Sequence, residues 1–338
     1  MKYITFARHY SPLEFDTIPG PMNETGSTGT GNELSPEMKT YYNTNLINLV
    51  GPYLVHDQFG QQENIPMNHG KTIEFRGFRP LTKALTPLTE GVTPQGEKLD
   101  MFTVVATLKQ YGSYVTLTDM LEFTAVDKMI LQAQERCGEQ AGLTLDTVTR
   151  EVINAGTNVQ YGDGSKTSRA ALTQEDLLTV KAIKKAVRAL KKQNTPKING
   201  IYPAVINPDV AYDLSEDPEY KELIKYTENS QFKNGFLYRL SGVEFYESTE
   251  AKIFASTGAS GIDVYSTILF GKGAYGVTKL AGNGLQTIIK QKGSAGSADP
   301  LDQRSTVGWK ATKAVAILVD QYMLRIETGS TFNDHQAN

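Results

Sequence analysis

The sequence contains a single cysteine, Cys137, and this scarcity excludes an intramolecular disulfide. A chain without disulfides is typical of a reducing compartment. Long hydrophobic runs are also missing: the longest, residues 314–319, is far below the ~20 apolar residues that a membrane-spanning helix needs. The first ten residues lack the apolar run of a secretion signal. We therefore expect a protein that is made in the cytoplasm, stays there and has no membrane partner.

A strong excess of one charge is absent as well. The 338 residues include 34 Lys and Arg against 37 Asp and Glu, a formal net charge of −3. Such a near-neutral chain has no overall electrostatic reason to bind nucleic acid or an anionic membrane. With 39% hydrophobic and 21% charged residues the chain can bury a core, and its length allows one large domain or two ordinary ones.

Motifs that carry chemistry are lacking too. The four histidines are His9, His56, His69 and His335. None has a second histidine at i,i+4 or a nearby acidic pair, so the spacing predicts surface or loop histidines and no metal site. The segment 91–96 has the glycine spacing of a phosphate loop, but Glu97 stands where that motif requires lysine.

Paired carboxylates are harder to exclude, because one stretch is rich in acids. Its acidic residues are Asp209, Asp213, Glu216, Asp217, Glu219 and Glu222. Their spacing fits the solvated face of a helix, with an acidic catalytic site as the alternative. Cys137 lies on an apolar stripe and is interpreted as a core residue, not a nucleophile. The sequence therefore predicts no catalytic, cofactor-binding or metal-ligating residue and no cofactor.

The strongest positive signal is an apolar stripe with helical periodicity. It consists of Phe123, Val126, Ile130, Ala133, Cys137, Ala141, Leu145, Val148 and Val152. Steps of three and four predict one continuous helix of about 30 residues, roughly 45 Å long. Gly138 and Gly142 interrupt good helix formers, which indicates a kink or a close approach of another segment.

A second amphipathic helix is predicted over 174–194, with Thr173 and Asp176 marking its N-terminus. Its predicted buried face comprises Leu177, Val180, Ile183, Val187 and Leu190. Cations gather on the other side: Lys181, Lys184, Lys185, Arg188, Lys191 and Lys192. This side is interpreted as a solvated face, with contact to an acidic neighbour or to nucleic acid as the alternative.

Two segments are too polar and too extended for a compact domain. Residues 1–35 are rich in Gly, Ser, Thr and Pro and predict a flexible arm, followed by a modest helix through Leu46, Leu49 and Val50. Alternating strands at 71–78 and 102–108 enclose the Pro- and Gly-rich segment 79–99. Two strands alone are marginal in water, so we expect a protruding hairpin that packs against something else.

The remaining pattern is a mixture of strands and short helices. Strands are predicted at 201–206, 243–246, 264–270, 275–279 and 285–291, with a short helix at 218–226. A final strand pair is expected from 314–319 and the alternating residues Tyr322, Leu324 and Ile326. The order predicts an α+β fold and not a regular βαβ series.

Three segments in this order resemble the major capsid proteins of tailed bacteriophages, in the branch that includes the coat protein of the N-four-like phages. They are YVTLTD at 114–119, QAGLTLD at 140–146, and GSAGSADPL at 293–301 continuing into QRSTVGWK at 303–310. The resemblance spans roughly residues 35–330. It implies a Hong-Kong-97-type fold and a subunit that closes hexamers and pentamers into an icosahedral shell around double-stranded DNA.

The resemblance also implies a division of the chain. Residues 1–70 would form an N-terminal arm, 71–113 an extended hairpin called the E-loop, and 114–196 a peripheral domain with the spine helix. Residues 197–292 would form the axial domain, and 293–338 would return to the peripheral domain. The implied partners are further copies of the chain, scaffolding, portal and decoration proteins, and packaged DNA. The implied location is the virion capsid, after assembly in the host cytoplasm.

Other functions remain open at this point. The chain could be another phage structural subunit, from a tail tube or a decoration layer. It could also be an intracellular enzyme with an acidic site within 209–222.

Overall fold

The computed structural model describes residues 46, 49–50, 53–65, 70–124, 129–225, 232–233, 236–237, 239–280, 284–294 and 299–338. The helices are α2 (Asp119–Thr124), α3 (Met129–Ile153), α4 (Val180–Lys192), α5 (Pro208–Glu216) and α6 (Pro218–Lys225), with single 3-10 turns η2 (Arg169–Ala171), η4 (Ala259–Gly261) and η6 (Asp320–Tyr322). The first strands are β1 (Gln61–Glu63), β2 (Thr72–Phe78), β3 (Met101–Thr107), β4 (Lys109–Thr118), β5 (Val159–Tyr161), β6 (Tyr202–Ile206), β7 (Phe232–Lys233), β8 (Phe236–Leu237) and β9 (Arg239–Leu240). The others are β10 (Val243–Glu247), β11 (Ile253–Phe254), β12 (Val264–Phe270), β13 (Tyr275–Thr278), β14 (Leu285–Lys290), β15 (Arg304–Lys313), β16 (Val315–Ile317) and β17 (Met323–Thr328).

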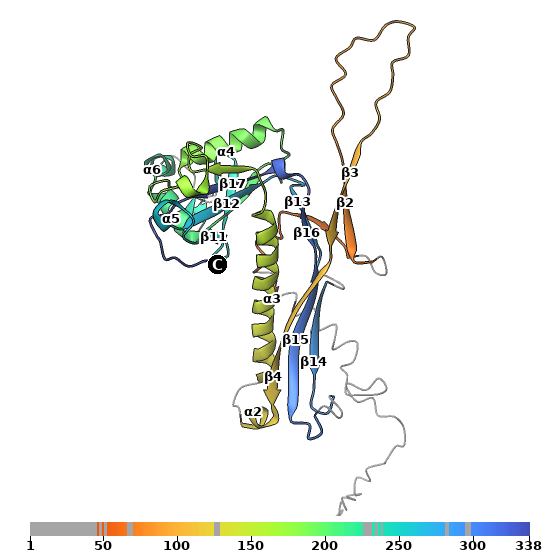
Figure 1. Cartoon of the computed structure of the whole chain (residues 1–338), viewed down its shortest axis with the longest axis vertical. Coiled ribbons are helices and arrows are strands. Elements are labelled where there is room, and N and C mark those ends of the chain that lie inside the picture. Colours follow the sequence, from red (N-terminus) through yellow and green to blue (C-terminus); the bar gives the residue numbers. More distant parts are fainter. Residues whose placement is uncertain are drawn as a thin grey trace, which may run out of the picture.

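Three parts of different shape make up the molecule (Figure 1). The head is a sheet with strand order β5-β17-β12-β6-β10-β9, with β11 on β12, and it carries α4, α5 and α6. The shaft consists of α3 lying along the sheet β14-β15-β4. The hairpin is β2 and β3 with the loop 79–100, and it projects away from both. A small sheet, β1-β13-β16, lies where the three parts meet.

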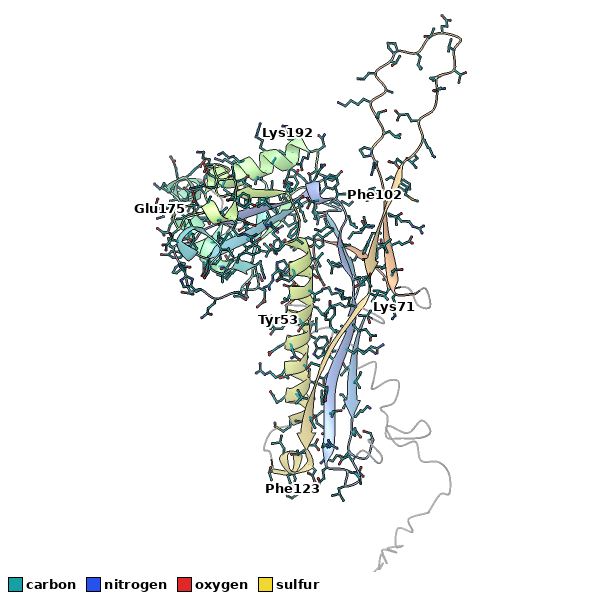
Figure 2. The ribbon with its side chains drawn as sticks, in the orientation of Figure 1. Tyr53, Lys71, Phe102, Phe123, Glu175 and Lys192 are labelled. Atoms are coloured by element: carbon teal, nitrogen blue, oxygen red, sulfur yellow. The ribbon has the colours of Figure 1, made fainter. Side chains whose placement is uncertain are left out.

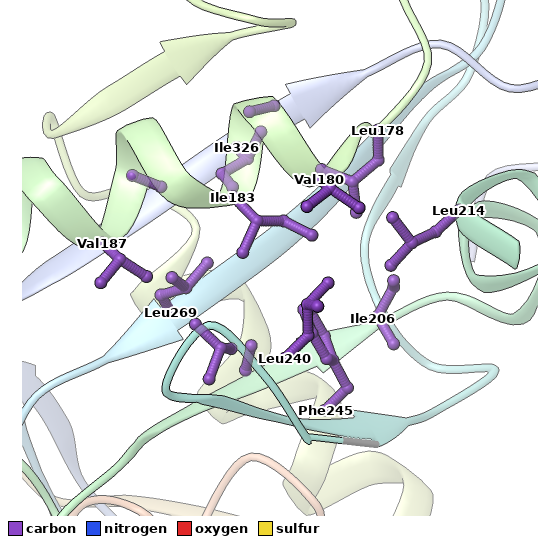
Figure 3. Close-up of a cluster of buried hydrophobic side chains, with 14 of the residues drawn as sticks. Leu178, Val180, Ile183, Val187, Ile206, Leu214, Leu240, Phe245, Leu269 and Ile326 are labelled. Atoms are coloured by element: carbon purple, nitrogen blue, oxygen red, sulfur yellow. The ribbon is translucent and has the colours of Figure 1, made fainter. Parts of the chain in front are cut away.

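The strands at the centre of the head are buried on both faces. Every residue of β12 and β17 is buried, because α4 covers one face of the sheet and the end of α3 covers the other. Val180, Ile183 and Val187 of α4 pack against Leu269 of β12 on the first face (Figure 3). Ile153 of α3 packs on the second face. Two covered faces explain why β12 carries apolar residues at successive positions. β17 also contains the buried Arg325 and Glu327, which form an ion pair at 2.8 Å.

The second helix begins six residues later than its sequence signal indicates. Thr179 caps α4, and its Oγ1 accepts a hydrogen bond from the backbone N–H of Ala182 at 3.2 Å. Thr173 and Asp176 do pair, since Asp176 accepts from the Thr173 backbone N–H at 2.7 Å, but they form a separate turn. Placing the N-terminus of the helix at Thr173 was therefore wrong. The domain division implied by the resemblance places residues 174–194 in the same domain as the long helix. In the structure, α4 packs in the core of the head.

The shaft is held by the apolar stripe of α3. Cys137, Ala141 and Leu145 are buried against Val307 and Trp309 of β15. The Trp309 indole N–H also donates to Gln140 Oε1 at 3.2 Å. The interpretation of Cys137 as a core residue is confirmed, and burial raises the pKa of its thiol.

The two glycines of α3 mark a close approach. A Cβ at Gly138 would lie 2.9 Å from Leu49 Cβ, and a Cβ at Gly142 would lie 2.7 Å from Tyr53 Cβ. The described residues Leu46, Leu49 and Val50 are helical, as the sequence predicts, and Leu46 and Val50 are buried in the same cluster as Cys137. The part of the chain between the predicted arm and Leu46 lies outside the described residues.

The predicted apolar stripe of the long helix is correct in its centre and wrong at its ends. Phe123 belongs to the separate helix α2 and is 87% exposed, so it is not part of the buried stripe, while Val126 lies outside the described residues. At the other end Thr149 and Ile153 are buried, whereas Val148 and Val152 are only half-buried. The burial shifts around the helix because the last turns of α3 are covered by the head as well as by the shaft sheet.

Most predicted strands are confirmed: 71–78, 102–108, 201–206, 243–246, 264–270, 275–279 and 285–291 all contain strands, and 218–226 contains α6. The final strand pair is wrong. β16 pairs with β13, and β17 pairs with β12 and β5, so the two last strands belong to different sheets. The mixture of helices and mainly antiparallel sheets confirms the α+β class.

Candidate assembly surface

The hairpin presents an apolar surface that no described residue covers. β2 and β3 pair antiparallel from Thr72 with Thr107 to Phe78 with Met101. Every residue from 78 to 101 is exposed, and Leu85 is 81% exposed. The large apolar side chains exposed here are Phe78, Leu81, Leu85, Leu88, Val92, Leu99, Met101 and Val105. Exposed apolar surface of this extent marks an interaction site.

The loop of the hairpin has little to hold it by itself. Arg79 donates its backbone N–H to the carbonyl of Asp100 at 2.9 Å, and their side chains pair at 3.4 Å with both groups well exposed. Thr82 donates a hydrogen bond to Glu97 across the loop. Exposed ion pairs contribute about 0 to 1 kcal/mol, far less than the cost of ordering twenty backbone residues. An external surface is therefore needed to fix this loop.

Among the described residues, only those at the base of the hairpin pack against the rest of the chain. Ile73, Phe75 and Ala106 are buried against Ala314, next to β16. The confirmed alternation of 71–78 and 102–108 places these residues on one face. A groove with a volume of about 710 Å³ runs between this base and the head, and its lining includes Phe75, Phe102 and Tyr322. The groove continues the apolar surface of the hairpin towards the head.

A second exposed apolar surface lies at the opposite end of the molecule. Met120 and Phe123 of α2 and Leu301, in the turn before β15, are all exposed (Phe123 is labelled in Figure 2). The hairpin and this end of the shaft are the two extremities of an elongated subunit. Apolar surface at both extremities suits a protein that contacts neighbours at each end.

One histidine is buried although it lies in a turn. His56 is buried, and its Nδ1 lies 2.7 Å from Asp146 Oδ2. The His56 backbone N–H donates to the other carboxylate oxygen, Asp146 Oδ1, at 2.8 Å. Next to this pair, Asp57 accepts from Thr149 Oγ1 at 2.5 Å. Tyr275 donates to the His56 carbonyl, and burial raises the pKa of its phenol. His56 lies in a turn, as the sequence predicts, but it is not at the surface, because no local pattern reveals a partner 90 residues away.

His335 is the other histidine among the described residues. His335 is exposed and lies 3.5 Å from Asp263. His9 and His69 lie outside the described residues. Within the described ranges no group of three or more His, Cys, Asp or Glu residues is arranged to hold a metal ion. In that same part of the chain, no helix is both long and apolar enough to cross a membrane.

The acidic stretch 209–222 is mainly structural. Asp213 is buried and accepts from Ser330 Oγ at 2.6 Å and from the Thr331 backbone at 3.0 Å. Asp217 accepts the backbone N–H of Val180 at 2.8 Å and thereby caps α4. The prediction of a solvated helix face is therefore wrong for Asp213 and Asp217, because their tertiary partners lie far away in the sequence.

The rest of the acidic stretch serves similar contacts. Asp209 accepts from the Tyr265 hydroxyl at 3.0 Å. Glu216 and Glu219 form ion pairs with Lys221 and Lys184. These bonds give the carboxylates structural partners, and they supply no acid–base pair directed into a cleft.

A helix-backed shaft, a head and a projecting apolar hairpin define a subunit whose surface is completed by its neighbours. The family model described as phage capsid protein matches residues 101–325, more than half of the chain. The capsid of Ralstonia phage GP4 aligns with a TM-score of 0.65 at 16% identity, over 84% of this chain and 90% of that chain. The cyanophage Pam1 capsid aligns with a TM-score of 0.65 at 14% identity, over 98% and 100%. The capsid of cyanophage P-SCSP1u aligns with a TM-score of 0.62 at 15% identity, over 82% and 89%.

The chain therefore belongs to the phage capsid protein family and is a major capsid protein, a structural component of the bacteriophage virion. Its Hong-Kong-97-type fold, which the segments at 114–119, 140–146 and 293–310 indicated, is confirmed. A comparison of the sequence with curated proteins found no match. The role of the subunit is structural, and it associates with further copies of itself in the capsid.

Proposed function

We propose that the subunit closes hexamers and pentamers of an icosahedral shell and that the shell encloses double-stranded DNA. The observation that carries this proposal is the hairpin, in which every residue from 78 to 101 is exposed although many are apolar. Burying one such Leu or Val side chain on a neighbour contributes about 1.5 to 3 kcal/mol. Several of these contacts per subunit offset the cost of ordering the loop.

The contact is heterologous, because the hairpin and the surface that receives it are different parts of the subunit. A heterologous contact closes into a ring when the rotation between neighbours divides a full turn evenly. Hexamers and pentamers are two such rings. The subunit does no chemistry in this role, and its function is the geometry of these contacts.

The parts of the fold have separate roles in the shell. We assign residues 1–70 to an arm, 71–113 to the E-loop that overlies a neighbour, and 114–196 with 293–338, apart from α4 and β17, to the peripheral domain. Residues 197–292 form the axial domain around the capsomer centre. The packing of α4 and β17 in the head core favours including both with the axial domain. Leu46 and Val50, buried against α3, support an arm that is anchored on its own shaft.

The shell forms in the host cytoplasm, where a reducing environment suits the single buried Cys137. Scaffolding, portal and decoration proteins are the partners that such a shell uses. The apolar end of the shaft, with Met120, Phe123 and Leu301, is the surface we assign to contacts between neighbouring capsomers.

Negative-stain electron microscopy and analytical ultracentrifugation of the full chain under assembly conditions test the proposal. We expect closed shells of megadalton mass with hexameric and pentameric capsomers. A monodisperse 37.2 kDa monomer would contradict self-assembly. Open tubes with helical symmetry would instead indicate a tail-tube subunit.

A further inference from the structure

The charge of the chain is strongly uneven along the sequence. Residues 177–208 contain no Asp or Glu. Their cations are Lys181, Lys184, Lys185, Arg188, Lys191, Lys192 and Lys197. Since the whole chain has a formal net charge of −3, these seven cations leave −10 for the remainder. A segment of this kind concentrates positive potential on the part of the surface where it folds.

In the first half of this segment, the lysines are paired with carboxylates from other parts of the chain. Lys181 and Lys185 lie 3.5 and 3.4 Å from Asp163, and Lys185 also donates to the Asp163 carbonyl at 2.5 Å. The Ser165 hydrogen bond and the nearby Lys185 ammonium lower the pKa of Asp163 to about 2, so this carboxylate is charged at neutral pH. Lys184 pairs with Glu219. The first turns of α4 therefore have internal counter-charges.

The second half of the segment keeps its charge. Five exposed cations form what we call the cationic patch: Arg188, Lys191, Lys192, Lys197 and Lys272. In the described part of the chain, none of the five forms an ion pair with a carboxylate. The patch lies at the end of α4 on the side of the hairpin, where Figure 2 shows Lys192.

The backbone brings these five residues together. Asn194 adopts a left-handed conformation, with φ of 54°, and ends α4. Thr195 and Asn194 then donate their N–H groups back to the carbonyls of Leu190 and Lys191, at 3.1 and 3.0 Å. The chain consequently folds against the last turn of α4, which keeps Lys197 beside it. Lys272 joins from another loop, because its backbone N–H donates to the carbonyl of Pro196 at 2.9 Å.

Helix stability alone does not account for the patch. Lys191 and Lys192 occupy the last turn of α4, where cations interact favourably with the helix dipole. Lys197 and Lys272 lie beyond the helix and gain nothing from its dipole. An ordinary solvated face also has charges of both signs close together. Asp163 and Glu219, which belong to other elements, supply negative charge beside the first half of α4.

We propose that the cationic patch binds the phosphate backbone of double-stranded DNA, without reading its sequence. This inference rests on the proposed function, in which the shell encloses DNA. A second copy of the chain is a poorer partner, because its acidic stretch 209–222 is largely used in internal bonds through Asp213, Asp217, Glu216 and Glu219. The aromatic ring beside Lys197 belongs to Tyr202, which is buried and offers no face to a base.

Binding of a 30-base-pair duplex to the full chain, followed by fluorescence anisotropy between 50 and 200 mM salt, measures this contact. Each phosphate neutralised lowers the slope of log K against log salt by about 0.9. We expect the triple variant Arg188→Gln, Lys191→Gln, Lys192→Gln to make the slope shallower by about 2.7 and to weaken binding at least tenfold at 50 mM salt. A second variant, Lys197→Gln with Lys272→Gln, removes two patch charges outside the helix and should make the slope shallower by about 1.8.

The matched control is Lys181→Gln, Lys184→Gln, Lys185→Gln, which removes the same charge from the same helix where it is already paired. We expect this control to change the slope by less than about 1. Equal losses of DNA affinity in the control and in the patch variants would show that only the net charge of the chain matters, and they would overturn the proposal. Unchanged DNA affinity in the patch variants would overturn it as well.

Electron microscopy of the same variants separates this inference from the proposed function. We expect patch variants to form normal shells, because the patch is assigned to DNA and not to a neighbouring subunit. Loss of shells in the patch variants with DNA affinity retained would place a neighbouring subunit on the patch and refute the DNA contact. Failure of the unaltered chain to form shells would contradict the proposed function, whatever its affinity for DNA.

Discussion

Lys313 donates from Nζ to both carboxylate oxygens of Asp57, at 2.8 and 2.7 Å, inside the shaft. Both side chains are buried, and Lys313 also donates to the Leu145 carbonyl at 2.8 Å. Burial lowers the pKa of the Lys313 ammonium, while the charge of Asp57 opposes that shift. The pair ties the last residue of β15 to the segment that precedes β1, 256 residues away in the sequence.

Removing one member of this pair should be costly. Lys313→Met leaves Asp57 buried without its cation, and we expect the free energy of unfolding to fall by about 3 to 5 kcal/mol. Urea denaturation of the free subunit measures this change. Lys310→Met, on the exposed face of the same strand, is the matched control and should change stability by no more than about 0.5 kcal/mol.

A double-mutant cycle tests whether Lys313 and Asp57 act together. Lys313→Met combined with Asp57→Asn should cost less than the sum of the two single changes, because no uncompensated buried charge remains. Additive losses would show that the two side chains contribute independently.

The exposed hairpin residues should matter for assembly and not for folding. We expect Leu85→Ser, Leu88→Ser and Val92→Ser together to leave the stability of the free subunit within about 0.5 kcal/mol, since all three are exposed. Shell yield by sedimentation should fall sharply, because about 1.5 to 3 kcal/mol is lost for each side chain that a neighbour buries. Thr86→Ser, Thr89→Ser and Thr93→Ser in the same loop are the matched control. Normal shells from the apolar variant would contradict the role of the hairpin between subunits.

Gly142 offers a test in which local propensity and tertiary packing disagree. Alanine at an exposed helical glycine stabilises a helix by about 1 kcal/mol. At Gly142, however, the new Cβ would lie 2.7 Å from Tyr53 Cβ. We expect Gly142→Ala to destabilise the subunit by about 1 to 2 kcal/mol in thermal unfolding, because overpacking outweighs propensity. A raised melting temperature would show that the segment around Tyr53 does not rest on α3.

Tyr265 should make stability depend on alkaline pH. Burial, together with the nearby charge of Asp209, raises the pKa of the Tyr265 phenol above its usual value. A group whose pKa is raised on folding contributes stability below its unfolded pKa of about 10 and loses that contribution as pH rises through the folded value. The stability of the native chain relative to Tyr265→Phe should therefore fall above pH 10, by up to about 1.4 kcal/mol per pH unit.

Chemical denaturation of both chains between pH 8 and pH 11 measures this difference. Tyr114→Phe, on the exposed face of the shaft sheet, is the control. A constant difference between the native chain and Tyr265→Phe across this range would show that the phenol is not buried against Asp209.

The spacing of apolar residues predicted a helix or strand correctly where one face of that element is buried along its length. The three- and four-residue steps through Ala133, Cys137 and Leu145 located the centre of α3, and the alternation of Ile73 and Phe75 located β2. The same reasoning failed at Phe123 and at Val152, because periodicity cannot show where the covering surface ends. It also failed at Thr173, where a real turn with helix-cap chemistry precedes the helix by several residues.

Composition and short-range spacing were enough to predict the projecting hairpin, the long helix with its buried stripe, and the lack of a recognised catalytic motif. The partners of the polar residues became known from the folded structure alone. It paired His56 with Asp146 and Lys313 with Asp57, directed Asp213 to Ser330, and separated β16 from β17 into different sheets. These pairings join residues about 90 to 260 positions apart, and such contacts arise from the packing of whole elements, which no local pattern records.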